Sequence, residues 1–217
     1  MEIFARNMKK EKMTLGLDID NVTADTAGLL VEILKDRYNF KGLERGHLTR
    51  RPFHESSKFL QLGISKDRVS MILDEIWRER FQDIQLMDSR IGTINKELQR
   101  NDVLIKVITT MGARDHSIRP NLQTWLEGKG ITYDGEISFV NGNAEKVSAP
   151  LHTIVDDEEN LAIGLANCGR PGILFEASWN KKFVAGLDLH PNPLIHVVHD
   201  WDELGEKVLE LNKAFRS

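Results

Sequence analysis

Short apolar runs that alternate with segments of helical periodicity constrain the fold of this chain more than any other feature. The run at 103–108, Val-Leu-Ile-Lys-Val-Ile, is rich in β-branched residues and only a few residues long, as expected for a strand of a parallel sheet. Parallel strands need crossover connections, and the helical segments between the runs supply them. The sequence therefore predicts an α/β fold with a parallel sheet flanked by helices.

The predicted elements divide the chain into a core and an insertion. The strands are expected at 14–18, 103–108, 137–140, 151–155, 172–175 and 195–198. The helices are expected at 24–40, 54–62, 65–81, 89–100, 119–129, 158–166 and 201–215, with Ser65 as the N-cap of the third. No buried strand is predicted between residues 40 and 89. We therefore expect a small helical cap at 24–87 inserted after the first strand, a Rossmann-like core at 14–23 and 88–217, and a flexible extension at 1–13.

Charge and cysteine content exclude several classes of protein. The chain has 29 basic and 33 acidic residues and a formal net charge of −4, so it lacks the overall positive charge with which proteins bind duplex nucleic acid. Its one cysteine, Cys168, cannot form an internal disulfide. No apolar segment approaches the roughly 20 residues of a membrane helix. We expect a cytoplasmic protein that binds neither membranes nor duplexes, and the sequence leaves its subunit number open, with a homodimer as one option.

Two aspartates, Asp18 and Asp20, follow the first apolar run. Alternation along a strand directs both side chains to the same side. In open α/β sheets, ligands bind in the crevice beyond the carboxyl ends of the strands. Two carboxylates so close repel each other unless a cation or a shared proton lies between them. The pair therefore predicts a magnesium site, although an isolated Asp-x-Asp can also serve only as a helix cap.

Three more signals fall near the ends of later predicted strands. Thr109 and Thr110 follow the run that ends at residue 108, where hydroxyl and backbone N–H groups can bind phosphate oxygens. Lys146 offers a compact cation for the same purpose, although a lone lysine is more often a solvated surface residue. Asp156 and Asp157 follow an apolar strand, and Asp157 could alternatively begin the next helix. We expect the sheet to bring these residues together with the first aspartate pair.

The order of these motifs resembles that of the haloacid dehalogenase-like phosphohydrolases. Within that superfamily the chain resembles the 5′(3′)-deoxyribonucleotidases, also called 5′-nucleotidases of type C, and their bacterial relatives. The further cues are Asp25, Phe81-x-Asp83, the pair Thr109-Thr110, the spacing of Lys146 and Asp156, Trp179-Asn180 and Trp201. The resemblance covers residues 14–215. It implies a Mg²⁺-dependent phosphomonoesterase.

The resemblance implies that Asp18 is the nucleophile, which attacks phosphorus and forms an aspartyl-phosphate. Asp20 would protonate the leaving oxygen, then activate water, and would also bind the metal through its backbone carbonyl. Thr109, Thr110 and Lys146 would bind the phosphoryl group.

The remaining implied roles concern the metal and the substrate. The metal ligands would be Asp18, Asp20, Asp156 and Asp157, a set of oxygen donors suited to Mg²⁺. Phe81 is the best candidate to stack on a nucleobase, and Trp77 lies on the same predicted helix face, although apolar residues at this spacing more often belong to the core. Arg114 or Arg119 would supply the cation that such nucleotidases carry after the second motif. The expected substrate is a nucleoside monophosphate.

Two alternatives remain open on the sequence alone. The same site could hydrolyse sugar phosphates or other small metabolites, because a cap can change specificity without altering the catalytic core. A non-catalytic module that binds Mg²⁺ or a nucleotide could also use this fold, although a binding site alone has no evident need for both a nucleophile and an acid.

Overall fold

The protein forms a six-stranded parallel sheet in the order β3-β2-β1-β4-β5-β6. The computed structural model describes residues 11–113 and 115–217, so the predictions for residues 1–10 and for Arg114 lie outside the described residues. The strands are β1 (Thr14–Leu17), β2 (Leu104–Thr109), β3 (Ser138–Phe139), β4 (Thr153–Asp156), β5 (Gly172–Phe175) and β6 (Ile195–Val198). The predicted α/β fold is confirmed.

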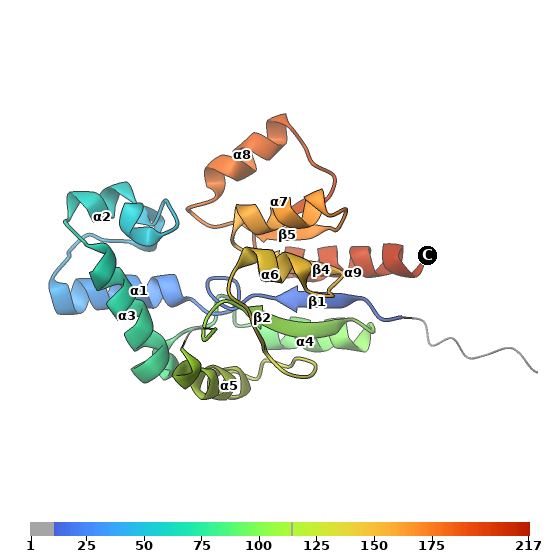
Figure 1. Cartoon of the computed structure of the whole chain (residues 1–217), viewed down its shortest axis with the longest axis horizontal. Helices are drawn as coiled ribbons and strands as arrows, with labels where there is room; N and C mark the ends of the chain where they lie inside the picture. Colours follow the sequence, from blue (N-terminus) through green and yellow to red (C-terminus); the bar gives the residue numbers. More distant parts are fainter. Residues whose placement is uncertain (1–10, 114) are drawn as a thin grey trace, which may run out of the picture.

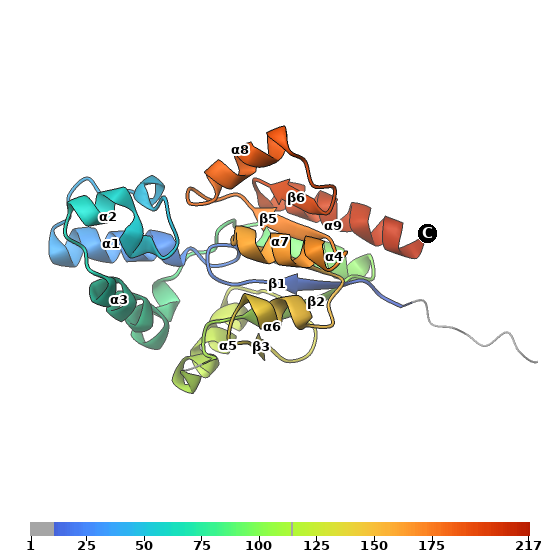
Figure 2. The same ribbon diagram turned by 45° about the horizontal axis from the view of Figure 1, so that its top comes forward.

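Helices cover both faces of the sheet. The helices of the described chain are α1 (Thr26–Tyr38), α2 (Ser57–Gln61), α3 (Lys66–Glu79), α4 (Ile91–Arg100), α5 (Arg119–Gly128), α6 (Asn143–Ser148), α7 (Glu159–Asn167), α8 (Lys181–Leu189) and α9 (Trp201–Arg216). In Figure 2, α6 and α7 lie in front of the sheet and α4 and α9 lie behind it. Within the part of the chain that the structure describes, no helix is both long and apolar enough to cross a membrane.

Two parts of the predicted helix pattern were wrong. Helices α6 and α8 occupy segments where the sequence predicts no helix. The single helix expected at 54–62 is instead a 3₁₀ turn, Phe53–Glu55, followed by α2. The break falls at Ser56, whose backbone is extended, with φ −64° and ψ 136°. Its hydroxyl accepts hydrogen bonds from the backbone N–H groups of Thr49 and Arg50, so this residue fixes the preceding loop rather than continuing a helix.

The central strands are buried on both faces, which explains their continuous apolar sequences. All four residues of β1 are buried, as are all four of β4 and of β5. Gly16 allows β1 and its surroundings to approach closely, because a Cβ atom there would lie 2.7 Å from Leu151 Cδ1 and 2.9 Å from Ile154 Cγ1. The strand that precedes Asp18 is therefore held rigidly at the centre of the sheet.

The segment from α1 to α3 lies beyond the carboxyl ends of the strands (Figure 1). The chain enters and leaves this segment along neighbouring paths: Asp25 N donates to Gln85 O and Met87 N donates to Thr23 O, each at 2.9 Å. We call residues 26–79 the cap block. It covers the edge of the sheet where the predicted site residues converge.

Candidate active site

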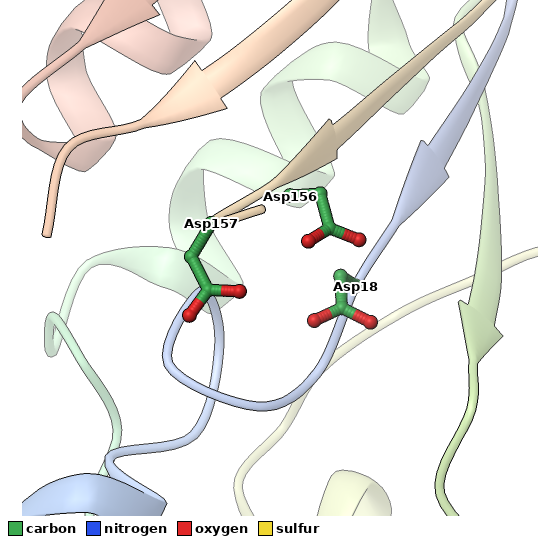
Figure 3. Close-up of side chains that lie close together, drawn as sticks. All are labelled: Asp18, Asp156 and Asp157. Atoms are coloured by element: carbon green, nitrogen blue, oxygen red, sulfur yellow. The ribbon is translucent and has the colours of Figure 1, made fainter. Parts of the chain in front are cut away.

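Three buried carboxylates meet at the carboxyl ends of β1 and β4 (Figure 3). Asp18 directly follows β1, Asp156 ends β4, and Asp157 follows it. One oxygen of each lies within 4.8 Å of the others, and the three residues are only 5%, 3% and 1% exposed. The adjacent parallel strands thus place three acids in one buried cluster, as the sequence predicts.

Lys146 lies against this cluster. Its Nζ donates to Asp18 Oδ1 and to Asp156 Oδ2, both at 2.6 Å, and the residue is 3% exposed. It is the only buried residue of the short helix α6, and this helix positions its side chain against the carboxylates. Lys146 is therefore not a solvated surface lysine.

The cluster has more negative charge than its neighbours neutralise. Burial raises the pKa of Asp18 well above its ordinary value, and repulsion by Asp156, Asp157 and Asp20 adds to the increase, although Lys146 opposes it. Burial likewise raises the pKa of Asp157 to about 7, against the attraction of Arg51. Burial disfavours the charge of Lys146, but the attraction of Asp156 and Asp18 raises its pKa nonetheless. The carboxylates fit a site for an additional cation.

The hydrogen bonds show which oxygens could bind that cation. Both oxygens of Asp156 are engaged, Oδ2 with Lys146 and Oδ1 with the backbone N–H of Glu158 at 2.9 Å. Among the described residues, no donor contacts Asp18 Oδ2 or Asp157 Oδ1. Carboxylate oxygens in a compact set suit Mg²⁺, which binds few carboxylates and keeps several waters.

The loop after Asp18 is held in a sharp turn. Asn21 adopts a left-handed conformation with φ 63°, which asparagine tolerates better than most residues. Its Oδ1 accepts from Ala27 N at 2.9 Å and from Thr26 Oγ1 at 3.2 Å, so it joins the turn to the start of α1. Thr23 Oγ1 also donates to the backbone carbonyl of Asp18 at 2.8 Å.

The carboxylate of Asp20 lies outside the three-carboxylate cluster. It lines a cavity of about 580 Å³ between the cap block and the core, together with Thr110 and Trp77. Its Oδ1 accepts a hydrogen bond from Trp77 Nε1 at 3.3 Å. Thr109 lies at the end of β2, where its buried Oγ1 accepts from Met111 N at 3.1 Å, leaving the threonine O–H able to donate.

Arg51 is a site residue that the sequence analysis did not identify. Its Nη2 lies 2.7 Å from Asp157 Oδ2, and its Nη1 lies 3.6 Å from Glu158 Oε1. The guanidinium also lies over the rings of Phe53 and Trp179, at 5.1 and 5.3 Å from their centroids. It lines both the 580 Å³ cavity and a neighbouring cavity of about 730 Å³. The pair Arg50-Arg51 before Pro52 is the one feature of the sequence that could have indicated a cation at this site.

The residues predicted to contact the substrate do not gather at one place, unlike the carboxylates. Phe81 packs against the core and lines neither cavity. Trp77 lines the 580 Å³ cavity but is only 3% exposed. Arg119 donates to Gly112 O at 2.9 Å and lies over the Phe139 ring, 4.3 Å from its centroid.

No protein-family model and no curated protein matches this sequence. Solved structures do match the fold. A conserved haloacid dehalogenase-like protein of unknown function from Agrobacterium tumefaciens aligns with a TM-score of 0.60 and 13% identity over 93% of this chain and 99% of its own. A haloacid dehalogenase-like hydrolase from Streptococcus pneumoniae gives 0.57 and 15% over 92% and 98%.

A third structure is of a hydrolase of the same family from Deinococcus radiodurans with bound phosphate and sodium. It gives a TM-score of 0.57 and 12% identity over 93% of this chain and 96% of its own. These similarities show that the chain has the haloacid dehalogenase-like fold.

Proposed function

We propose that this chain, with its haloacid dehalogenase-like fold, is a Mg²⁺-dependent phosphomonoesterase that forms an aspartyl-phosphate. The observation that carries the proposal is the buried cluster of Asp18, Asp156 and Asp157 with Lys146 bonded to two of its members. Burying so many ionisable groups is costly for folding, so a site that uses them explains the arrangement better than stability does.

Asp18 acts as the nucleophile in this proposal. One of its oxygens is held by Lys146, and the other has no donor among the described residues and can approach a phosphorus atom. Attack forms an Asp18–phosphate bond and breaks the bond from phosphorus to the ester oxygen. The proton for the departing oxygen comes from the carboxyl group of Asp20, which lines the cavity.

Water then hydrolyses the aspartyl-phosphate. Asp20, now ionised, takes a proton from the water as its oxygen bonds to phosphorus, and the bond to Asp18 breaks. Inorganic phosphate is released, and both aspartates return to their starting protonation states. Lys146 offsets negative charge on Asp18 through both steps, and the Thr109 and Thr110 hydroxyls supply hydrogen bonds to phosphoryl oxygens.

The cation would be held by the free oxygen of Asp157 and by Asp18 Oδ1, the oxygen that does not attack phosphorus, with Asp156 as an outer partner and the backbone carbonyl of Asp20 as a further ligand. When bound, Mg²⁺ would neutralise charge so that an anionic carboxylate can approach an anionic phosphate ester. We propose that Asp157 contacts the metal directly, because both oxygens of Asp156 already have partners.

A nucleoside monophosphate is the substrate that we propose. The cavity next to Asp20 has a volume of about 580 Å³, within the range of about 300–1,000 Å³ for small-molecule sites. Its lining includes the apolar side chains of Phe53, Leu73 and Met111, which suit the flat face of a base. Its lining also includes the polar side chains of Asn141 and Asn143, which suit a sugar.

The test is phosphate release from ribo- and deoxyribonucleoside monophosphates and from sugar phosphates, with and without Mg²⁺. The Asp18→Asn variant serves as the blank. Mg²⁺-dependent release that favours nucleotides and falls at least about 10³-fold in the variant would support the proposal. Release spread over sugar phosphates would keep the mechanism and change the substrate. Full activity in Asp18→Asn would exclude the covalent mechanism.

A further inference from the structure

The carboxylate of Asp20 has a hydrogen-bond donor from the cap block. Trp77 Nε1, on α3, donates to Asp20 Oδ1 at 3.3 Å. We propose that Trp77 is a positioning residue that holds Asp20 in the orientation needed for proton transfer. The inference rests on the proposed function, which assigns that transfer to Asp20.

Trp77 is itself held firmly. It is 3% exposed, and its ring meets that of Trp125 edge to face, with centroids 5.8 Å apart and planes at 80°. The side-chain amide of Asn121 donates to the backbone carbonyls of Trp77 and Arg78, at 3.0 and 2.9 Å, and so joins the end of α3 to α5. The indole N–H therefore has a fixed direction, and the buried ring is a poor platform for stacking a nucleobase.

Asp20 needs such a partner because it lies on a loop. The terminal torsion of an aspartate has a broad energy minimum, so a free carboxyl group samples many directions. The bond from Trp77 occupies Oδ1 and leaves Oδ2 available to the cavity that Asp20 lines. Proton transfer requires a donor within hydrogen-bond reach of the leaving oxygen, so a fixed carboxyl group raises the fraction of productive complexes.

The position of the tryptophan has a second consequence. Asp20 belongs to the core, in the loop after β1, whereas Trp77 belongs to the cap block. The hydrogen bond thus couples the placement of the cap block to the orientation of the acid. The acid is fully oriented when α3 packs on α5 as observed.

The test compares two phosphate esters that differ in leaving group. An alkyl phosphate, such as a nucleoside 5′-monophosphate, releases a basic alkoxide that must be protonated as it leaves. In contrast, p-nitrophenyl phosphate releases a stable phenolate that can leave without being protonated. In Trp77→Phe, which removes the N–H and keeps an aromatic ring, we expect kcat/KM for the alkyl ester to fall about tenfold, because kcat/KM reports on the step that breaks the ester bond and not on the later hydrolysis of the aspartyl-phosphate. For the aryl ester we expect kcat/KM to change by no more than about twofold.

Trp125→Phe is the matched control. Trp125 belongs to the same ring pair and donates its own Nε1 to the carbonyl of Ile84 at 3.1 Å, so the control loses a comparable hydrogen bond without touching Asp20. It should affect both esters equally. In an Asp20→Asn background, Trp77→Phe should cause no further selective loss for the alkyl ester.

Thermal melting of each variant separates loss of folding from loss of positioning. If Trp77→Phe does not fold, Trp77→Met removes the same N–H with a side chain that adapts to irregular gaps, and the same dependence on leaving group is expected. Equal losses for the two esters, or the same selectivity in Trp125→Phe, would overturn the role of Trp77. Wild-type protein that hydrolyses neither ester would overturn the proposed function and this role with it.

Discussion

Replacing Lys146 by methionine is expected to destabilise the metal-free protein strongly at pH 8. Methionine has nearly the length of lysine but no charge, so the packing of α6 changes little while the ammonium group is lost. Lys146 is 3% exposed and lies 2.6 Å from both Asp18 and Asp156. The substitution therefore leaves two buried carboxylates without their shared cation.

The magnitude follows from these distances. At an effective dielectric constant of about 20, each 2.6 Å contact is worth about 6 kcal/mol, most of which is offset by the desolvation of three charged groups. Removing one partner of a buried ion pair typically costs about 3–5 kcal/mol. For a chain of this size, such a loss lowers the melting temperature by about 6–20 °C.

The assay is urea or thermal unfolding at pH 8 and pH 5.5, with and without Mg²⁺. The loss should be smaller at pH 5.5, because burial already raises the pKa of Asp18 and a proton can then replace the missing charge. It should also be smaller with Mg²⁺. Lys106→Met is the control, because Lys106 lies on β2 and forms no ion pair among the residues that the structure describes. An Lys146→Met protein as stable as wild type at pH 8 without Mg²⁺ would refute the reasoning.

Two further predictions concern the cluster and its turn. The pKa of Asp157 is raised from its ordinary value near 4 to about 7, so between these pH values the folded protein keeps a proton on Asp157 that the unfolded chain releases. The contribution of this proton to the free energy of unfolding should therefore fall as the pH rises from about 4 to 7. Urea unfolding without Mg²⁺ should show this slope in wild type but not in Asp157→Asn, and a wild-type slope unchanged by that substitution would contradict it. Asn21→Ala should cost about 2–4 kcal/mol, since it removes two acceptor contacts and places alanine at φ 63°. Asn21→Gly should cost less in the same assay, and equal losses would argue against the backbone contribution.

The sheet could be predicted from the sequence because its strands are short and apolar, and β1, β4 and β5 at its centre are buried on both faces. The predicted strands at 172–175 and 195–198 match β5 and β6 in both bounds. Helices α6 and α8 were not predicted. The six-residue α6 buries only Lys146 and has no apolar stripe, whereas α8 carries Phe183, Val184 and Leu187 at helical spacing but buries no residue.

The candidate site could likewise be predicted only in part. Asp18, Asp156 and Asp157 could be placed together from the sequence, because parallel strands bring their carboxyl ends to one edge of the sheet. The contacts of Arg51 with Asp157 and of Trp77 with Asp20 could not. They depend on how the cap block packs against the core, which no local pattern in the chain encodes.

The paired connections of the cap block have a consequence for how such a chain can vary. Thr23 and Met87, and likewise Asp25 and Gln85, are joined by backbone hydrogen bonds at the point where the chain leaves and re-enters the core. The intervening segment therefore begins and ends at nearly the same place. Insertions, deletions or wholesale exchange of that segment need not alter the spacing of β1 and β2, so specificity can diverge while the chemistry of the sheet edge is kept.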